Sequence, residues 1–269
     1  MPRRREGTKL LRPVVSVILP FFRDAATLAP AIDSILSQKS ADFEVILYDD
    51  GAEGAARDVA LNAAAQAPRV RVLGGAHVGI AVALQRGCAA ARGRYIARMD
   101  ADDVAHPERL AAQHALMESD ARVALFGTQV VLSCEDIGSG RERYRELINA
   151  LTTHEDLLRE LYVECPLPHP TFFMRRDAYE AVGGYRAGEY PEDYDLVLRF
   201  VTAGYRLGKV ARPLLHWRHR PDRLSMTDPR YGLDRFRALK REHLLATRLA
   251  GGRPFYQWGA GEVGKAWLR

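Results

Sequence analysis

The sequence is poor in cysteine and contains no long apolar run. Its three cysteines, Cys88, Cys134 and Cys165, are an odd number and lack the spacing of a metal site. We therefore expect reduced thiols and a cytoplasmic setting, because small secreted proteins are usually stapled by paired cysteines. No apolar run is long enough to cross a bilayer, and the basic start at Arg3–Arg5 leads into no apolar segment. We therefore expect neither a membrane span nor a signal peptide.

The excess of positive charge is also small. The chain has 39 basic and 34 acidic residues, which gives a formal net charge of +5. A balance of this size is typical of a solvated surface, and it favours at most an anionic small molecule or a membrane surface. We expect no nucleic-acid partner.

What the sequence does contain is a regular alternation of strand and helix patterns. With 269 residues, of which 47% are hydrophobic, the chain can bury the core of a single α/β domain. Helical patterns, such as the one with Leu28, Ile32 and Ile35 on one side, separate four apolar runs. The expected strands are Val14–Leu19, Phe43–Tyr48, Val70–Leu73 and Tyr95–Met99. This order indicates a parallel, right-handed, doubly wound sheet.

Polar residues follow three of these strands. They are Pro20–Asp24 after the first strand, Asp49 and Asp50 after the second, and Asp100–Asp103 after the fourth. Ligands of such sheets bind outside the carboxyl ends of the strands. We therefore expect these three segments to meet at one crevice.

The acidic segment after the fourth strand has two interpretations. Side chains two positions apart leave an extended chain on the same side, so Asp100 and Asp102 can converge on one point. Two carboxylates suit Mg²⁺ or Mn²⁺, whose open positions the phosphate oxygens of a nucleotide diphosphate fill. The alternative is an acidic turn that caps a helix beginning near Pro107.

The order of motifs resembles that of inverting family 2 glycosyltransferases, over roughly residues 14–228. The matching segments are Val15–Phe22, Ser34–Gln38, Asp49–Gly51, Gly87–Ile96, Asp100–Asp103, His106–Gln113, His169–Thr171, Gly183–Tyr185 and Glu192–Leu196. The resemblance implies the GT-A fold, an α/β architecture with a Rossmann-like, mostly parallel central sheet flanked by helices. A smaller β/α region on the acceptor side completes this fold.

The resemblance also divides the chain into parts. A basic tail (1–12) precedes a nucleotide-sugar-binding half (13–115), an acceptor-binding half (116–228) and a C-terminal helix (229–250). In the acceptor half we expect a β-rich stretch at Ala121–Leu132 and a polar helical insertion at Arg141–Leu161 to build the acceptor wall. A further strand is expected at Phe172–Met174.

Nucleotide and metal contacts follow from the resemblance, position by position. Phe22 lies against the nucleotide base, and Asp50, with Asp49 as a substitute, accepts a hydrogen bond from the base. Asp100 faces the ribose or the metal, and Asp102 binds Mn²⁺ or Mg²⁺. Pro20 and Ala101 complete the expected nucleotide site.

One departure from the family pattern concerns the phosphates. Many members have an Arg and an Asn in the helix after Gly79, where this chain has Leu84 and Gln85. Arg98 is a candidate to supply the missing charge. A salt bridge at the edge of the core is the other interpretation of Arg98.

The catalytic base is expected in the second half. Transfer with inversion is a single displacement in which a carboxylate takes the proton of the acceptor hydroxyl. The resemblance gives this role to Asp193, with Glu192 positioning it or contacting the acceptor. A first-turn helix position favours the ionised form, although the same two residues could simply cap the helix. Asp195 is expected to orient a neighbour or to form a salt bridge.

Three further residues are weaker candidates for the acceptor or diphosphate side. His169 can line the acceptor pocket, or it can be a loop residue with local hydrogen bonds. Arg218 and His219 lie where similar enzymes have a loop that closes over the diphosphate. A solvated basic loop is the alternative for both.

The C-terminal region carries two other patterns. Phe236, Leu239, Leu244, Leu245 and Leu249 give a basic helix one apolar side, which packs on its own domain or lies at the inner face of a membrane. In 251–269, a strand pattern at Phe255–Trp258 and the glycines Gly259, Gly261 and Gly264 resemble the start of a dinucleotide-binding unit. We interpret this segment as the beginning of a truncated second domain.

Four function classes compete. We favour a metal-dependent glycosyltransferase that moves sugar from a nucleotide-diphosphate sugar, expected to be UDP-linked, to a saccharide or lipid-linked acceptor. A sugar-nucleotide nucleotidyltransferase usually needs a Gly-rich basic loop after the first strand, which Phe21–Asp24 is not. The others are a non-catalytic nucleotide-sugar-binding module, which an intact Asp102 and Asp193 disfavour, and a nicotinamide-dependent oxidoreductase, which rests on the terminal glycines alone.

Overall fold

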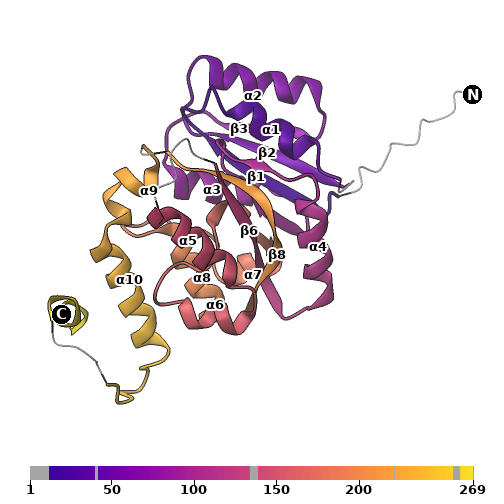
Figure 1. The fold of residues 1–269 in the computed structure, drawn as a ribbon. Coiled ribbons are helices and arrows are strands. Elements are labelled where there is room, and N and C mark those ends of the chain that lie inside the picture. The colour runs from indigo at the N-terminus through magenta and orange to yellow at the C-terminus, as the bar shows by residue number, and fades with distance from the viewer. Residues whose placement is uncertain (1–11, 40–41, 134–138, 221, 257–260, 269) are drawn as a thin grey trace, which may run out of the picture.

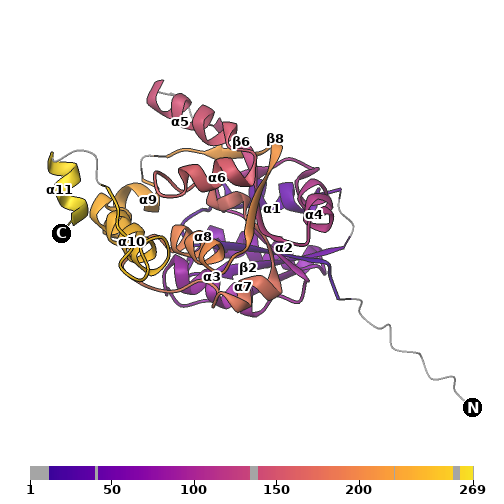
Figure 2. The same ribbon diagram turned by 90° about the horizontal axis from the view of Figure 1, so that it is seen from below.

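The computed structural model describes residues 12–39, 42–133, 139–220, 222–256 and 261–268 (Figures 1 and 2). Three features of the sequence lie outside these ranges: the Arg3–Arg5 tail, Cys134, and the Gln257–Ala260 part of the terminal glycine segment. No helix among the described residues has both the length and the apolar character needed to span a membrane.

The first half of the chain forms the parallel sheet that its sequence predicts. Strands β1 (Val15–Phe21), β2 (Phe43–Asp49), β3 (Val70–Gly74) and β4 (Tyr95–Arg98) take the order β3-β2-β1-β4, and all three pairings are parallel. β1 and β2 are buried along their whole length. This explains why they appear in the sequence as continuous apolar runs.

The second half extends the same sheet with a different pattern. β7 (Phe173–Arg175) pairs antiparallel with β4 and with β6 (Val123–Ser133), and β8 (Arg206–Arg218) runs parallel to β6. The short β5 (Val104–Ala105) closes the order β3-β2-β1-β4-β7-β6-β8-β5. The expectation of a mostly parallel sheet with a smaller acceptor-side region is confirmed.

Helices cover both faces of the sheet (Figure 2). α1 (Leu28–Leu36), α2 (Ala55–Gln66) and α4 (Arg109–Ser119) share one core with Val15, Val17 and Leu19 of β1. α3 (Ile80–Ala89), α6 (His154–Glu160), α7 (Arg176–Ala181) and α8 (Glu192–Thr202) share the other with Ile18. The alternation of β1 side chains between the two cores follows from strand geometry.

The expected helical insertion consists of two helices. α5 (Ser139–Ala150) ends before Thr153, whose hydroxyl accepts the backbone N–H of Asp156 at 3.1 Å and caps α6. The Asp156 carboxylate accepts the Thr153 N–H in return, at 3.3 Å. This reciprocal capping box starts a new helix, and its Thr and Asp spacing is the sequence signal for the break.

The C-terminal region continues along the outside of the second half. α9 (Leu224–Thr227) and the 3₁₀ turn η2 (Pro229–Tyr231) lead into α10 (Leu233–Ala246), whose Leu239 is buried and whose Phe236 ring lies 5.8 Å from that of Tyr194. This helix therefore packs on its own domain, while Leu245 stays exposed. Phe255 and Tyr256 do not form the expected strand, and α11 (Glu262–Leu268) follows.

Candidate active site

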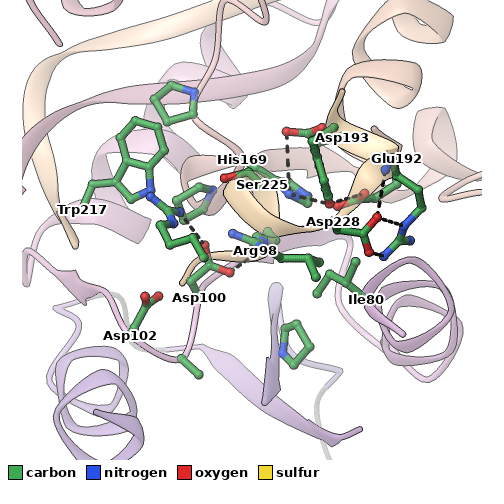
Figure 3. Close-up of a pocket in the computed structure, with 18 of the residues that line it drawn as sticks. Ile80, Arg98, Asp100, Asp102, His169, Glu192, Asp193, Trp217, Ser225 and Asp228 are labelled. Atoms are coloured by element: carbon green, nitrogen blue, oxygen red, sulfur yellow. Dashed lines mark hydrogen bonds and ion pairs between the residues drawn. The ribbon is translucent and has the colours of Figure 1, made fainter. Parts of the chain in front are cut away.

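A cavity of about 460 Å³ lies where the carboxyl ends of β1, β2 and β4 face η1 (His169–Thr171) and the N-terminus of α8 (Figure 3). Of the residues singled out in the sequence, nine line it together with Arg98. They are Pro20, Phe22, Asp50, Asp100, Ala101, Asp102 and, across the cavity, the group His169, Glu192 and Asp193. Asp49, Arg218 and His219 are not among the lining residues.

Three carboxylates gather at the end of β4. Asp100, Asp102 and Asp103 each offer an oxygen within 4.8 Å of the others. Burial and the charge of Asp100 raise the pKa of Asp102 to about 6. Asp103 is almost fully buried, and its Oδ1 accepts the backbone N–H of Arg218 at 2.7 Å. An all-oxygen set crowded with negative charge fits a hard divalent cation such as Mg²⁺ or Mn²⁺.

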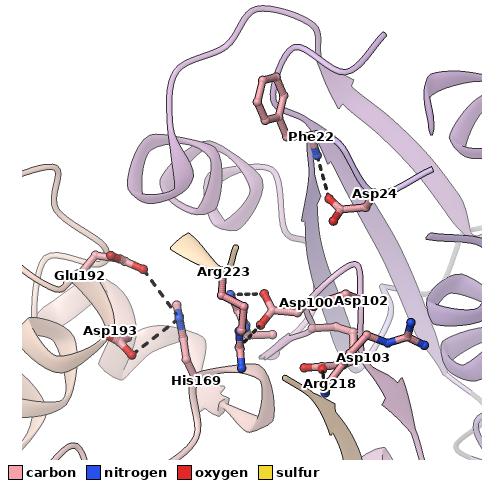
Figure 4. A network of polar contacts seen from close by, with 12 residues as sticks. Phe22, Asp24, Asp100, Asp102, Asp103, His169, Glu192, Asp193, Arg218 and Arg223 are labelled. Atoms are coloured by element: carbon pink, nitrogen blue, oxygen red, sulfur yellow. Dashed lines mark hydrogen bonds and ion pairs between the residues drawn. The ribbon is translucent and has the colours of Figure 1, made fainter. Parts of the chain in front are cut away.

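Two arginines that follow β8 face these carboxylates. The Nε atom of Arg220 lies 3.3 Å from Oδ2 of Asp102, and its Nη2 lies 3.5 Å from Oδ1 of Asp24. Nη2 of Arg223 lies 3.8 Å from Oδ2 of Asp100 (Figure 4). These two guanidinium groups bring positive charge next to the carboxylate cluster, and guanidinium groups suit the binding of phosphate oxygens.

Arg98 lies between the acidic cluster and the opposite wall. It is buried, lines the cavity and forms an ion pair with Asp100. Its backbone is fixed from α4: the Nη2 atom of the fully buried Arg109 donates to the Arg98 carbonyl at 2.6 Å. Gln113 accepts from Arg109 at 3.2 Å and donates to the Thr171 carbonyl at 2.7 Å, so α4 ties the end of β4 to η1.

An aromatic surface lies at the β1 and β2 end of the cavity. The rings of Phe22 and His77 stack with centroids 4.5 Å apart. The Asp50 carboxylate accepts the backbone N–H groups of Val78 at 2.6 Å and Gly79 at 3.1 Å, which fixes the turn before α3. Asp49 instead accepts from the backbone of residues 51 and 52, at 3.0 and 2.6 Å. Of the two, Asp50 is the one placed to meet a ligand.

The opposite wall carries an acidic pair at the start of α8. Glu192 is buried, and its Oε2 accepts the hydroxyl of Tyr231 at 2.7 Å. Burial and the neighbouring Glu192 charge raise the pKa of Asp193 to about 7. Nδ1 of His169 lies 3.8 Å from Glu192 and 4.0 Å from Asp193, and its Nε2 is 2.7 Å from the Tyr185 hydroxyl. Burial and the charges of Arg98 and Arg223 hold the His169 pKa well below its usual range.

Asp195 forms the salt bridge that was one of its two expected roles. Its carboxylate binds Nη2 of Arg199 at 2.7 Å, and the same Arg199 atom donates to the Gly184 carbonyl at 2.6 Å. The pair holds the first turn of α8, and with it Asp193, against the Gly183–Tyr185 segment.

Sequence reasoning missed several residues of the cavity. Arg220, Arg223, Tyr231 and His77 all line it. The basic run after β8 was recognised, but its contacts fall on Arg220 and Arg223, while Arg218 reaches the site only through its backbone N–H and the His219 N–H donates to the Ser133 carbonyl. The alternation of side chains along a strand could not predict the contacts of Arg220 and Arg223, because β8 ends at Arg218.

The family model described as "Glycosyl transferase family 2" matches residues 16–183. This chain belongs to that family. The amylovoran biosynthesis glycosyltransferase AmsE of Erwinia amylovora is 30% identical over 186 residues, which cover 69% of this chain and 68% of AmsE. The protein is thus a family 2 glycosyltransferase.

Solved structures identify the fold of this glycosyltransferase as GT-A. The mannosyltransferase PcManGT from Pyrobaculum calidifontis, in complex with GDP-Man and Mn²⁺, superposes with a TM-score of 0.60 at 19% identity, covering 94% of this chain and 69% of that one. TarS 1–349 of S. aureus, in complex with UDP-GlcNAc, superposes with a TM-score of 0.65 at 15% identity, covering 86% and 66%.

Proposed function

We propose that this glycosyltransferase transfers sugar with inversion from a nucleotide-diphosphate sugar, using a divalent metal at Asp102 and Asp100 and a general base at Asp193. The observation that carries the proposal is one cavity with the acidic cluster on one wall and the Glu192–Asp193 pair on the other. A donor held at its diphosphate by the first wall would point its sugar at the second. No other described cavity joins these two groups.

The chemistry assigned to Asp193 follows from its surroundings. A base must be ionised to accept a proton, and it works best when its pKa lies near the operating pH. The pKa of about 7 at Asp193 meets this condition. Burial also raises the pKa of Glu192, whose Oε2 accepts the Tyr231 hydroxyl, and the Glu192 charge is one cause of the raised pKa of Asp193. The metal, when bound, would neutralise charge on the leaving diphosphate.

We propose UDP as the donor nucleotide. TarS supports this choice, since its structure contains UDP-GlcNAc, whereas PcManGT contains GDP-Man. In this chain the stacked Phe22 and His77 rings offer a surface to either base. The identity of the bound nucleotide is therefore the first property to measure.

We propose a saccharide or lipid-linked acceptor, as expected for the synthesis of a surface polysaccharide. AmsE supports this, because it is a glycosyltransferase of amylovoran biosynthesis. We propose that the enzyme works in the cytoplasm at the inner face of the membrane. The exposed Leu224, Met226 and Leu233, close in sequence to the cavity-lining Ser225 and Tyr231, support a lipid-side approach.

Calorimetric titration of UDP, GDP, ADP and TDP with and without Mn²⁺ tests the proposal. We expect one nucleotide to bind in the presence of Mn²⁺ and Asp102→Ala to lose that binding. Asp33→Ala is the matched control, since Asp33 is an exposed carboxylate on α1, away from the cavity. Failure of every nucleotide to bind the wild-type chain would overturn the proposal.

The reaction itself needs a second measurement. The anomer first released from the bound donor, in transfer or in slow hydrolysis, is read by proton NMR before it equilibrates. We expect inversion, and we expect Asp193→Asn to stop release without weakening nucleotide binding. Binding without release in the wild-type protein would instead favour a nucleotide-sugar-binding module.

A further inference from the structure

Arg98 has hydrogen-bond donors that the folded chain leaves unused. Only 4% of the residue is exposed, and its Nη2 pairs with Asp100. Nε and Nη1 are buried and have no hydrogen-bond partner among the described residues. Buried guanidinium donors are normally satisfied, because an unpaired polar group away from water is destabilising. The unused side of Arg98 therefore points to a ligand oxygen.

The position of Nε and Nη1 indicates which part of the nucleotide sugar they meet. Arg98 is the last residue of β4 and Asp100 follows in the turn, and the two paired side chains both line the cavity. In Figure 3 the Arg98 side chain lies in the middle of the cavity, with Asp100 on one side and His169 toward the Glu192–Asp193 pair on the other. The positive charge of Arg98 acts on both walls, since it lowers the pKa of Asp193 and of His169.

The nucleotide and the diphosphate of the nucleotide sugar are proposed to contact other residues of the cavity. The stacked Phe22 and His77 and the Asp50 carboxylate form the nucleotide end. Arg220 and Arg223 face Asp102 and Asp100, the place proposed for the diphosphate. What remains between that place and the proposed base is the transferred sugar, and Arg98 lines this part of the cavity with two unused donors.

We propose that Arg98 binds the sugar of the donor, with one sugar oxygen accepting from Nε and another from Nη1. Nε–H and Nη1–H leave different edges of the planar guanidinium, so each can meet its own ligand oxygen while Nη2 stays with Asp100. The inference rests on the proposed function, which supplies the donor. It adds that Arg98 distinguishes a nucleotide sugar from the bare nucleotide.

The test compares nucleotides with and without the sugar. UDP, UDP-glucose and UDP-glucuronate, with GDP and GDP-mannose as the second series, are titrated into wild type and Arg98→Lys in the presence of Mn²⁺. Lysine keeps a positive charge beside Asp100 but lacks the separate Nε and Nη1 donors of the guanidinium. We expect Arg98→Lys to bind UDP or GDP with an affinity within about twofold of wild type. We expect it to bind the matching nucleotide sugar about tenfold more weakly than wild type does. A larger loss for UDP-glucuronate than for UDP-glucose would identify a carboxylate as the partner.

Two more variants separate the explanations. Arg98→Gln removes the charge and should deepen the sugar-dependent loss. Arg223→Gln is the matched control and should weaken nucleotide and nucleotide sugar by the same factor. Equal weakening of both ligands in Arg98→Lys, or no weakening of either, would overturn the inference. Absence of binding in the wild-type chain would instead overturn the proposed function itself.

Discussion

The Nδ1 atom of His169 lies 4.0 Å from Oδ2 of Asp193, across the gap between η1 and α8 (Figure 4). The other ring nitrogen of His169 is 2.7 Å from the Tyr185 hydroxyl. The ring is held neutral, because burial and two arginines lower its pKa. If Tyr185 donates to Nε2, the His169 proton is on Nδ1 and points to the acidic pair.

Substitution of His169 by alanine should therefore slow the reaction without removing the donor site. We expect kcat to fall about tenfold to a hundredfold, with a smaller change in the donor KM. Loss of the N–H dipole of His169 should also raise the pKa of Asp193. The rise of the rate with pH should therefore shift to higher pH. Tyr185→Phe, which releases the ring without deleting it, should give a weaker form of both effects. An unchanged pH profile in His169→Ala would show that the ring does not act on Asp193.

The pKa of about 7 at Asp193 predicts the pH dependence of the wild-type enzyme. The proposed base works deprotonated, so kcat/KM should rise with pH through about 7 and then level off. Asp193→Asn should lose this limb together with most of the activity, by about a hundredfold to ten-thousandfold. Initial rates at fixed metal concentration across the pH range measure both. The midpoint of the rise should lie within about one pH unit of 7. Rates that are flat across pH 5–8 would contradict the assignment of Asp193 as the base.

The same carboxylate should destabilise the fold at neutral pH. Its ordinary pKa is 3.8 and its folded value is about 7, so between these values the folded state binds a proton that the unfolded state has lost. Stability therefore falls as the pH rises through this window. Asp193→Asn should raise stability by about 1–2 kcal/mol above pH 7 and by much less near pH 4. Thermal melting of both proteins at the two pH values checks the sign.

Much of this architecture could be predicted from the sequence, and the limits have physical causes. The apolar runs of β1 and β2 predict buried parallel strands, which the structure contains. Asp100 and Asp102 of the acidic turn after β4 line the cavity, as expected. Arg109 and Gln113 were flagged only by family resemblance. Their role became clear in three dimensions, where they tie Arg98 to Thr171 over long sequence separations.

Other parts depend on geometry that no local pattern carries. Asp49 and Asp50 look equivalent in the sequence, but Asp49 turns back to the N–H groups of its own turn while Asp50 faces the loop before α3. Likewise, the contact of His169 with Tyr185 joins residues 16 positions apart, which no helix or strand period would bring together. Tertiary packing therefore decides which of the two carboxylates lines the cavity.

The buried pair of Asp195 and Arg199 should support the active site through stability. Removing Arg199 leaves the buried Asp195, among the described residues, with only the more distant His243, 3.7 Å from Oδ1, and loss of a buried partner costs up to about 3–5 kcal/mol. We expect Arg199→Leu to lose stability on this scale, because Arg199 also donates to the Gly184 carbonyl. Urea unfolding measures the loss. Arg122→Leu is the control, since Arg122 forms an exposed pair with Asp120 that should contribute little to stability.

The three aspartates after β4 should not contribute equally to metal binding. Asp102 lines the cavity, whereas Asp103 does not and already accepts the Arg218 N–H. Asparagine at position 103 keeps that acceptor oxygen, so Asp103→Asn should bind Mn²⁺ with UDP within about tenfold of wild type. Asp102→Asn removes a charged ligand and should weaken binding about a hundredfold or more. Titration of Mn²⁺ at saturating UDP separates the two variants. Equal losses in both would mean that Asp103 is itself a ligand and that its bond to β8 breaks when the metal enters.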